Sequence, residues 1–485
     1  MAYRAHKSRA ECFPACGAAL SIGAASEKSY ISLSSNSIIL HLSSHLMLIE
    51  FSVENFRSFK ERMTLSMVAN NSGELLHSNT VSAGKKLRLL KSAAVYGANA
   101  SGKSNLVKAL EFMLKFMLSS VKDTQIGERL NFEPFLLNTS EWDKPSLFEI
   151  IFIVNETRYR YGFQLNERMI VSEWLFQQQK NGEKALFTRE GRIFTLSSAF
   201  KEAKGLEPRT RDNALFLSVL AQFNVSVANT ILHNVGISSI FNNIIVDRIV
   251  ENAYLSIELS ENIPEIASFL NNFNLGFTEI SIHKPTYKEF APTIASKALY
   301  DLRDALSDFI NQTQNDSNSF PKIFTKHHVL DTKNLGVQII DFSLEKQESE
   351  GTKKIVAFAY TFIQALQQGS CVIFDEIDTN LHPILSRKII ELFNNSETNP
   401  KGAQLIFTTH DTNLLSRKLL RRDQIWFTEK MPHGATDLYS LADFEVNEEQ
   451  SAQSASYSED YLLGKYGAIP YIGDVGALFG GKAHE

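Results

Sequence analysis

The sequence predicts an α/β fold: a parallel sheet with helices, an antiparallel β lobe and a mostly helical insertion. Strand and helix patterns alternate in the C-terminal third, which is typical of a parallel sheet. Short strands joined by polar turns between residues 148 and 196 indicate an antiparallel meander. The composition is that of a globular protein, with 44% hydrophobic and 21% charged residues among 485.

Charge and cysteine content exclude several classes of protein. The 49 basic and 54 acidic residues give a net charge of −5, so no overall basic field indicates a nucleic-acid partner. Three cysteines, Cys12, Cys16 and Cys371, are too few for a disulfide framework or a four-thiolate zinc site. No segment reaches the roughly 18–20 apolar residues of a membrane span. We therefore expect a cytoplasmic protein without a membrane partner.

The first 46 residues differ from the rest of the chain because they are rich in Ser and Ala and lack a clear strand or helix pattern. From Met47 to Phe59 apolar and polar residues alternate, as in a strand. We interpret residues 1–46 as an unfolded extension and Met47 as the functional start. A cleaved signal peptide is the alternative interpretation.

The remaining elements follow in order along the chain. A buried strand ending in SAAVY is expected over Leu87–Tyr96, and a helix over Ser104–Ser120. The meander is expected to contain Phe148–Val154, Tyr159–Leu165, Val171–Gln178, Ala185–Arg189 and Ile193–Leu196. Asn213–Leu270 has mostly helical periodicity, whereas Gly276–Ile282 and Val337–Phe342 have strand patterns. The C-terminal alternation comprises strands Val372–Phe374, Gln404–Thr408 and Ile425–Phe427, and helices Pro383–Phe393 and Leu414–Leu420.

A phosphate-binding loop is predicted between the SAAVY strand and the helix that follows. The segment GANASGKS fits G-x-x-x-x-G-K-[ST] in full, and such a loop wraps phosphate with backbone N–H groups at a helix N-terminus. Its lysine would reach the β- and γ-phosphates and its serine would bind Mg²⁺. The predicted nucleotide-binding residues here are Gly97, Asn99, Ala100, Ser101, Gly102, Lys103, Ser104 and Asn105.

An apolar strand delivers two carboxylates that complement this loop. In the segment CVIFDE, Asp375 is expected to join Ser104 in binding Mg²⁺, and Glu376 to polarise the attacking water. A strand that ends in Asp-Glu is commonplace by itself. Together with the phosphate loop it predicts a P-loop ATPase that uses ATP and Mg²⁺.

Two further motifs distinguish among ATPases. Ser349, Gly351 and Lys353 precede a helix expected over Ile355–Leu366, where Ser and Gly can hold an anion. The alternative is that Ser349 is only a helix N-cap. His410 ends the strand LIFTT, in a position that resembles that of the switch histidine of ABC-type ATPases, which contacts the γ-phosphate; the alternative is that a lone His of this kind is structural.

The order of these motifs resembles the ABC-type ATPases of the RecF/SMC/OLD group, over about residues 47–472. The segments DEIDTNLHP, FTTHDTNLL and YLLGKYGAIPYI look like those of bacterial abortive-infection ATPases of the RloA/AbiLi kind, with the PARIS and Septu ATPases as cousins. The signature departs from the transporter pattern, because it is Ser-Glu-Gly-Thr-Lys rather than Ser-Gly-Gly-Gln.

The resemblance implies an ABC-type P-loop ATPase head. It implies an N-terminal ATPase lobe with the meander at 47–200, the mostly helical insertion at 201–335, and a C-terminal ATPase lobe and tail at 336–485. Lys103, Glu376 and His410 would be catalytic. Arg57 would approach the phosphates, or would be a solvated arginine in a turn. The cluster Lys418–Arg422 is predicted to be a solvated helix end rather than a nucleic-acid contact.

The resemblance also implies partners. ABC-type ATPases form head-to-tail homodimers, or higher homo-oligomers, in which one phosphate loop faces the other chain's signature motif. The defence relatives imply a sensor or scaffold that controls a separately encoded, nuclease-like effector and responds to a phage protein. The alternative is a RecF/SMC-like ATPase that repairs or organises DNA. A self-contained nuclease of the OLD kind is disfavoured because too short a segment follows His410.

Overall fold

The computed structural model describes residues 46–84, 86–122, 125, 127–237, 239–241, 263–283, 322–331, 336–444 and 457–470. All of them belong to one unit of mutually contacting chain, Ser43–Glu485. The extension predicted at residues 1–46 lies outside the described residues except for Leu46. The proposed start, Met47, is the first residue of strand β1. The predicted boundaries at residues 200 and 335 stay predictions.

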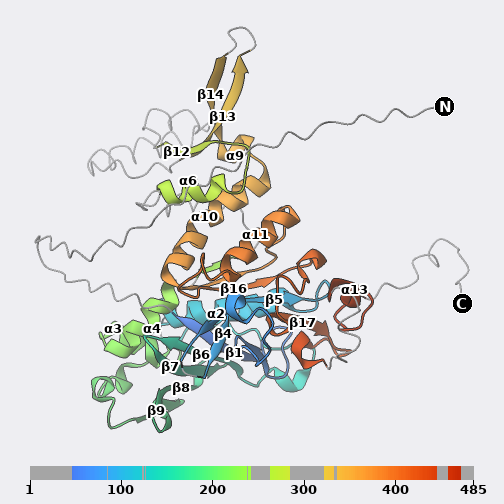
Figure 1. Ribbon diagram of the computed structural model, residues 1–485. Helices are drawn as coiled ribbons and strands as arrows, with labels where there is room; N and C mark the ends of the chain where they lie inside the picture. The colour runs from blue at the N-terminus through green and yellow to red at the C-terminus, as the bar shows by residue number, and fades with distance from the viewer. Residues whose placement is uncertain are drawn as a thin grey trace, which may run out of the picture. The chain divides into compact units, whose positions relative to one another are not determined.

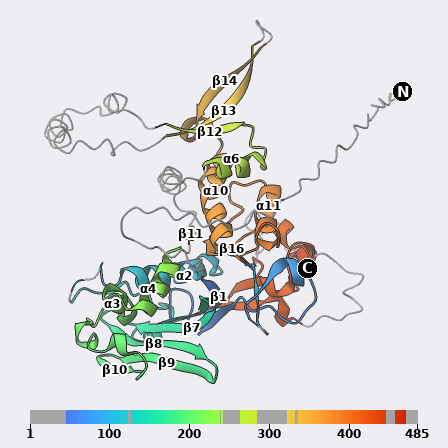
Figure 2. The ribbon, with the colours of Figure 1, turned by 60° about the vertical axis from the view of Figure 1, so that its left-hand side comes forward.

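A seven-stranded antiparallel sheet contains the predicted meander, and neighbouring strands β7 to β10 lie side by side (Figure 2). Its order is β10-β9-β8-β7-β6-β1-β2. The strands are β1 (Met47–Glu54), β2 (Met63–Ser66), β6 (Ser146–Val154), β7 (Thr157–Leu165), β8 (Ile170–Gln179), β9 (Gly182–Glu190) and β10 (Ile193–Leu196). The β6–β7 turn has left-handed φ at Asn155 (49°) and Glu156 (60°), which matches the twist of a two-residue hairpin.

A six-stranded mixed sheet carries the chemistry-bearing motifs. Its order is β11-β15-β16-β5-β17-β18, and every neighbouring pair is parallel except β17 with β18. The strands are β5 (Ser92–Tyr96), β11 (Ser239–Phe241), β15 (Cys371–Phe374), β16 (Gln404–Thr408), β17 (Ile425–Lys430) and β18 (Thr436–Ser440). Strands β5, β15 and β16 are buried along their whole length, as expected for parallel strands covered on both faces.

This sheet separates two hydrophobic cores, because successive side chains of a strand point to opposite faces. On β5, Ala93 and Val95 belong to the core shared with α2 (Lys103–Ser119) and the antiparallel sheet, whereas Ala94 and Tyr96 belong to the core shared with α10 (Glu350–Gln368) and α11 (Pro383–Asn394). Figure 1 shows α10 and α11 on one side of the sheet and α2 on the other.

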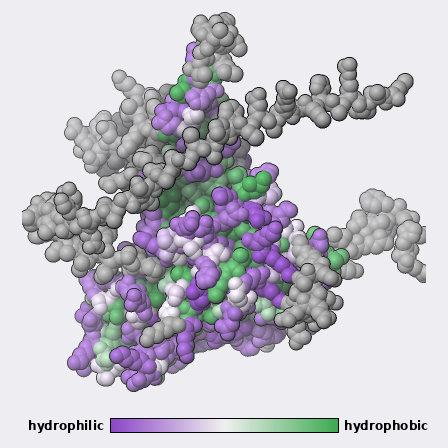
Figure 3. Space-filling view, in the orientation of Figure 1, coloured by the Kyte–Doolittle hydropathy of each residue, from purple (hydrophilic) through white to green (hydrophobic). Residues whose placement is uncertain are grey.

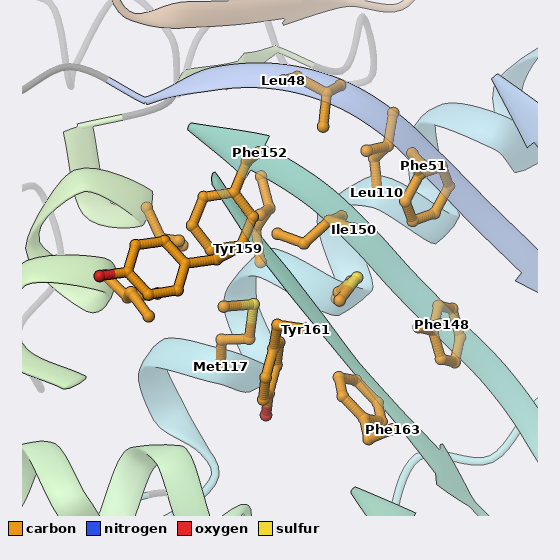
Figure 4. Close-up of a cluster of buried hydrophobic side chains, with 14 of the residues drawn as sticks. Leu48, Phe51, Leu110, Met117, Phe148, Ile150, Phe152, Tyr159, Tyr161 and Phe163 are labelled. Atoms are coloured by element: carbon orange, nitrogen blue, oxygen red, sulfur yellow. The ribbon is translucent and has the colours of Figure 1, made fainter. Parts of the chain in front are cut away.

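The core under α2 is rich in aromatic side chains. Figure 4 shows Leu110 and Met117 of α2 among Phe148, Phe152 and other residues of β1, β6 and β7. Phe148 packs against Phe163 with ring centroids 5.5 Å apart. On the face shown in Figure 3, hydrophilic residues dominate the described surface and hydrophobic ones form separate patches. Phenylalanine side chains such as Phe148 and Phe163 thus lie in the interior of the described chain.

The segment predicted to be mostly helical contains both helices and strands. Its described elements are α3 (Phe216–Gln222), α4 (Ser226–Ile237), β11, α6 (Ile263–Asn271), β12 (Glu279–His283) and β13 (Lys322–Asp331). Strands β12 and β13 form a three-stranded antiparallel sheet with β14 (Gly336–Ser343), followed by α9 (Leu344–Gln347). Smaller elements are α1 (Leu76–Asn79), β3 (Thr80–Ser82), β4 (Arg88–Leu90) and α13 (Tyr457–Leu462).

No single helix within the described ranges has the length and hydropathy to cross a membrane. The helices Phe216–Gln222 and Ser226–Gly236 reach that length and hydropathy only when they are counted together, and the pair is bent by 104° at the break between them.

Two local predictions in the C-terminal part are wrong. Leu414–Leu420 is not a helix: a short 3₁₀ turn, Thr412–Leu414, is followed by irregular chain, because the Asp411 side chain accepts a hydrogen bond from the Asn413 N–H and starts a tight turn. The cluster Lys418–Arg422 is not a solvated helix end, because Arg421 is buried and forms a bidentate pair with Asp423.

Candidate nucleotide-binding site

The loop Gly97–Gly102 joins β5 to α2 in the conformation that its glycines allow. The φ angles are 153° at Gly97, 62° at Ala100 and 120° at Gly102, all in the region that side-chain-bearing residues rarely adopt. A Cβ at Gly97 would collide with Thr428, and one at Gly102 with Thr436. Strands β17 and β18 therefore support the loop so closely that only glycine fits at these two positions.

The Lys103 side chain is folded back over this loop. Its Nζ donates hydrogen bonds to the backbone carbonyls of Gly97 (2.8 Å) and Ala98 (3.0 Å), and the residue is only 5% exposed. Burial lowers the pKa of Lys103 to about 8, while Glu376, Asp375 and Asp378 raise it and so oppose part of that shift. A cation placed this way is short of counter-charge, which a bound phosphate can supply.

Asp375 is the junction between the phosphate loop and strand β16. Its Oδ1 accepts hydrogen bonds from the Ser104 hydroxyl (3.2 Å) and from the Thr408 hydroxyl (2.7 Å). Hydroxyl and carboxylate oxygens are the hard ligands that Mg²⁺ prefers. In the described part of the chain, no group of three His, Cys, Asp or Glu residues can hold a metal alone. Mg²⁺ usually binds through one or two protein oxygens together with substrate phosphates, and Ser104 and Asp375 supply two such oxygens.

Glu376 follows β15 with a left-handed backbone (φ 54°). Its N–H donates to the Thr408 hydroxyl (2.7 Å), and its carboxylate accepts from the Thr379 hydroxyl (3.1 Å). The Thr408 side chain thus links the metal-binding and the base candidates. The carboxylate of Glu376 influences the pKa of Lys103, so the two predicted catalytic groups share one electrostatic environment.

His410 lies just past the end of β16, beside the same carboxylates. Its backbone N–H donates to Asp378 Oδ2 (3.4 Å). Burial and the Lys103 charge lower the pKa of His410, while Asp378, Glu376 and Asp375 raise it in part. The structure therefore brings Lys103, Glu376 and His410 together at the carboxyl ends of β5, β15 and β16, where ligands bind in open parallel sheets.

The signature residues are arranged differently. Ser349 is the N-cap of α10, and its Oγ accepts from the Thr352 N–H (3.1 Å). A Cβ at Gly351 would meet the Asn380 carbonyl, and Lys353 pairs with Glu350 (2.7 Å). Within the described residues, no hydrogen bond or ion pair joins Ser349, Gly351 or Lys353 to the phosphate loop. Both readings of Ser349 stay open, because a cap serine on an exposed turn can also face a ligand.

The remaining predicted nucleotide contacts lie around the loop. Asn99 and Ala100 are exposed at its tip, Ser101 is buried with its hydroxyl 2.6 Å from Thr428 Oγ1, and Asn105 donates to the Ser58 hydroxyl (2.8 Å). Arg57 lies in a turn, is partly exposed, and its guanidinium forms an ion pair with Glu133 (2.8 Å). Its predicted phosphate contact stays a prediction.

Sequence reasoning missed Thr408 and Lys354. Thr408 was seen only as part of the strand end, although its hydroxyl connects two key residues. Lys354 is buried, and its amino group donates to the carbonyls of Glu376, Ile377 and Thr379. A signal existed for Lys354: Phe358 follows four residues later, on the same helix face, and that face is apolar.

Comparison with known proteins identifies a matching family and a number of similar solved structures. Residues 92–416 match the family described as "AAA domain, putative AbiEii toxin, Type IV TA system". The chain is similar to the Smc head bound to the C-winged helix domain of ScpA, with 15% identity, 83% of this chain and 99% of that chain covered, and a TM-score of 0.35. It is also similar to the recombination mediator protein RecF-ATPrS in the RecFOR pathway, with 13% identity, 81% and 98% coverage, and a TM-score of 0.29. No curated protein matches the chain.

Proposed function

The chain belongs to this AbiEii-type family of AAA domains, and from that membership we propose that it binds ATP with Mg²⁺ and hydrolyses it to ADP and phosphate. One observation carries the proposal: the Asp375 carboxylate accepts from both Ser104 and Thr408, and Thr408 accepts from the Glu376 N–H. These hydrogen bonds hold the phosphate loop, the candidate metal-binding oxygens and the candidate base in fixed relative positions, and such preorganisation is the main source of phosphoryl-transfer catalysis.

Each residue has a defined role in this proposal. Lys103 would exchange its two carbonyl partners for phosphate oxygens, and Ser104 and Asp375 would hold Mg²⁺, whose charge would offset that of the phosphates. Glu376 orients the attacking water and accepts its proton. His410 contacts the γ-phosphate. Its lowered pKa favours the neutral ring in the free protein, and a bound anion would favour protonation.

The first experiment separates binding from hydrolysis. Glu376→Gln keeps the size and the Thr379 contact of the side chain but removes its basicity. We expect the purified variant to bind ATP as the unaltered protein does and to hydrolyse it at least ~100-fold more slowly. ATP binding is measured with a fluorescent analogue, and turnover by phosphate release. Loss of ATP binding in this variant would show that Glu376 is not the base.

We further propose that two copies assemble head to tail. The signature turn, Ser349–Lys354 at the start of α10, would complete the nucleotide site of the partner copy. Ser349 is exposed and the signature residues make no hydrogen bond to their own phosphate loop in the described part of the chain, which supports action on another copy. ATP would then hold the assembly together and hydrolysis would release it, so that nucleotide state sets assembly state. Higher homo-oligomers built from the same contact are compatible with this proposal.

At the level of biology, we propose a cytoplasmic sensor or scaffold in an anti-phage, abortive-infection system. It would control a separately encoded, nuclease-like effector and respond to a phage protein. The family description, which names a putative AbiEii toxin of a type IV TA system, and the resemblance of the motifs to those of RloA/AbiLi-type ATPases support this proposal. The test is co-expression with the neighbouring gene: protection from phage should need both proteins and an intact Lys103.

The second candidate is an ATPase that repairs or organises DNA, as the RecF/SMC-like motif order suggests. Filter binding to DNA over a salt series distinguishes the two candidates, because phosphate contacts give a steep salt dependence. The net charge of −5 favours protein partners. Tight, salt-sensitive DNA binding that depends on ATP would favour the second candidate.

A further inference from the structure

Lys354 occupies a position that neither the phosphate loop nor the signature motif explains. It lies in the first turns of α10, is only 2% exposed, and its amino group points at the loop after β15. The Nζ donates to the backbone carbonyls of Thr379 (2.8 Å), Glu376 (3.2 Å) and Ile377 (3.4 Å). One side chain of α10 thus binds three backbone carbonyls within the four-residue stretch Glu376–Thr379, which carries the candidate base.

The loop that Lys354 holds needs outside support. Glu376 has φ 54°, in a region where a residue with a side chain persists only when its surroundings fix it. Thr408 fixes this loop from strand β16 through the Glu376 N–H. Lys354 fixes it from the opposite side, through the carbonyls. The position of the Glu376 carboxylate therefore depends on α10 as well as on the sheet.

A second contact joins the same two segments. Gly351, one turn before Lys354, lies so close to the Asn380 carbonyl that an added Cβ would stand 2.6 Å from that oxygen. The turn Ser349–Lys354 and the loop Glu376–Asn380 are thus packed together at both ends. Any movement of the signature turn would displace the Glu376 loop with it.

We propose that Lys354 is a positioning residue that makes the signature turn and the Glu376 loop one rigid piece, and so couples the two nucleotide sites of a dimer. This inference rests on the proposed head-to-tail ATPase. In that dimer Glu376 serves the nucleotide of its own chain, whereas Ser349 serves the nucleotide of the partner. Binding at one site would then set the geometry of the base at the other through Lys354.

The chemistry of the residue supports a geometric role. Burial lowers the pKa of Lys354 to about 8, although Asp378 and Glu376 raise it in part. A buried ammonium is a costly way to fill space, and an apolar side chain would stabilise the fold at least as well. What lysine adds is three directed hydrogen bonds to backbone oxygens that no apolar side chain can make.

The test compares Lys354→Met with Lys91→Met. Lys91 is a matched control: it is also 2% exposed, its pKa is also lowered to about 8, and it donates to Asn394 O and Ser396 Oγ at the other end of β5. We expect Lys354→Met to lower kcat for ATP about 10- to 100-fold with KM changed less than about threefold, because the phosphate loop is intact. The Hill coefficient for ATP should fall to about 1. Lys91→Met should change neither.

A readout without turnover tests the contact itself. In the nucleotide-free protein, amide hydrogen exchange of the peptide that covers 376–381 should be faster in Lys354→Met than in Lys91→Met. If Lys354→Met does not fold, Gly351→Ala carries the test, because its added Cβ pushes the same two segments apart and should give the same direction of change. Equal exchange and equal kinetics in the Lys354 and Lys91 variants would overturn the proposal. Absence of turnover in the unaltered protein would instead overturn the proposed ATPase, and exchange would still decide the role of Lys354.

Discussion

The phosphate loop and the signature turn are both helix N-termini, yet they are built in different ways. At the start of α2, two glycines with positive φ, a buried lysine and the oxygens of Ser104 and Asp375 converge on one point. At the start of α10, the serine caps its own helix through Thr352, and Lys353 is paired with Glu350. The first site contains a buried cation, its candidate metal-binding oxygens and its base candidate; the second presents an exposed serine and little else.

A helix N-terminus alone therefore does not make a phosphate site. The dipole is similar at both helices, but only the phosphate loop places a cation and a neighbouring strand end around the space in front of it. The signature turn becomes a nucleotide contact only if another surface supplies the phosphate. Variants at the two helix N-termini test whether the sites differ in function as they do in structure.

The largest effect is expected at Lys103. Lys103→Ala should lower ATP turnover at least ~100-fold, because no other cation lies within the loop to balance the phosphate charge. Thermal stability should stay the same or rise, since the variant no longer buries an ammonium whose pKa is lowered to about 8. Phosphate release and thermal unfolding measure the two quantities. Retained hydrolysis would contradict the site assignment.

Mixing two inactive variants tests whether the signature turn acts on another copy. Lys103→Ala disables the phosphate loop, and Ser349→Arg blocks the signature turn. In a mixed dimer one interface combines both lesions, while the other pairs an unaltered loop with an unaltered turn. We expect mixing to restore ATPase activity. Each mixed dimer should reach at most about half the activity of an unaltered dimer.

ATP-induced dimerisation has to be measured alongside by light scattering. Mixed dimers that form but do not turn over ATP would count against independent composite sites. If Ser349 acts on its own chain's nucleotide, every protomer carries one lesion and no mixture recovers. That result would remove the contrast between the two helix N-termini.

A smaller effect than that of Lys103→Ala is expected at Thr408, whose hydroxyl links Asp375 to the Glu376 N–H beside the phosphate loop. Thr408→Val keeps the shape of the side chain but removes the hydroxyl that donates to Asp375 and accepts from the Glu376 N–H. We expect kcat to fall about tenfold. Unfolding free energy should fall by about 1–3 kcal/mol, because a buried N–H loses its acceptor.

The control for Thr408→Val is Thr64→Val. The Thr64 hydroxyl of β2 lies within hydrogen-bond distance (2.8 Å) of the Ser52 hydroxyl of β1. Kinetics equal to those of the unaltered protein are expected for Thr64→Val. If Thr408→Val also has the kinetics of the unaltered protein, Asp375 and Glu376 hold their positions without the hydroxyl.

The buried lysines Lys103 and Lys354 should differ in how their pKa values respond to nucleotide. Burial lowers the pKa of both Lys103 and Lys354 to about 8, but only Lys103 is expected to meet phosphate. Titration by ¹⁵N NMR should show the pKa of Lys103 rising when a non-hydrolysable ATP analogue binds, with Lys354 nearly unchanged. Without nucleotide, the unfolded chain holds the Lys103 proton up to pH ~10.5 and the folded chain only to about 8. Stability therefore rises with pH across that window, and Lys103→Met should weaken the rise.

The sequence predicted the α/β fold and the meander because local patterns determine both. The motif GANASGKS requires left-handed glycines and a helix start, and Gly97, Gly102 and Lys103 have that geometry. Patterns failed where contacts between distant segments decide. The apolar period of Leu414–Leu420 reflects burial of irregular chain, and the charge of Arg421 is matched by Asp423 rather than by water.

The same reason explains why Thr408 and Lys354 were missed. Their roles depend on which carbonyl or carboxylate a fold brings near, across 33 residues from Asp375 to Thr408 and 25 from Lys354 to Thr379. The three-stranded sheet β12-β13-β14 was likewise only half predicted. Its central strand β13 contains KHH and has no clear alternation, and its pairing with β14 becomes visible only in the register Phe324 to Ser343.

The smallest effect is expected at the N-terminal edge of the core that supports the phosphate loop. Leu46 was predicted to lie in the unfolded extension, yet its side chain is 4% exposed and belongs to the same core as α2. The adjacent Leu48 is fixed to Gln404 of β16 through its N–H (2.6 Å) and its carbonyl (3.0 Å), which do not depend on Leu46. A protein that starts at Met47 should therefore stay soluble and keep its ATPase activity. It should lose about 1–3 kcal/mol of unfolding free energy relative to one that retains Leu46 after an initiator methionine, because a buried leucine is removed. The loss should appear equally with and without nucleotide, since the signature turn packs in the other core. A larger loss, or one that changes ATP turnover, would mean that the two cores are less independent than the sheet between them implies.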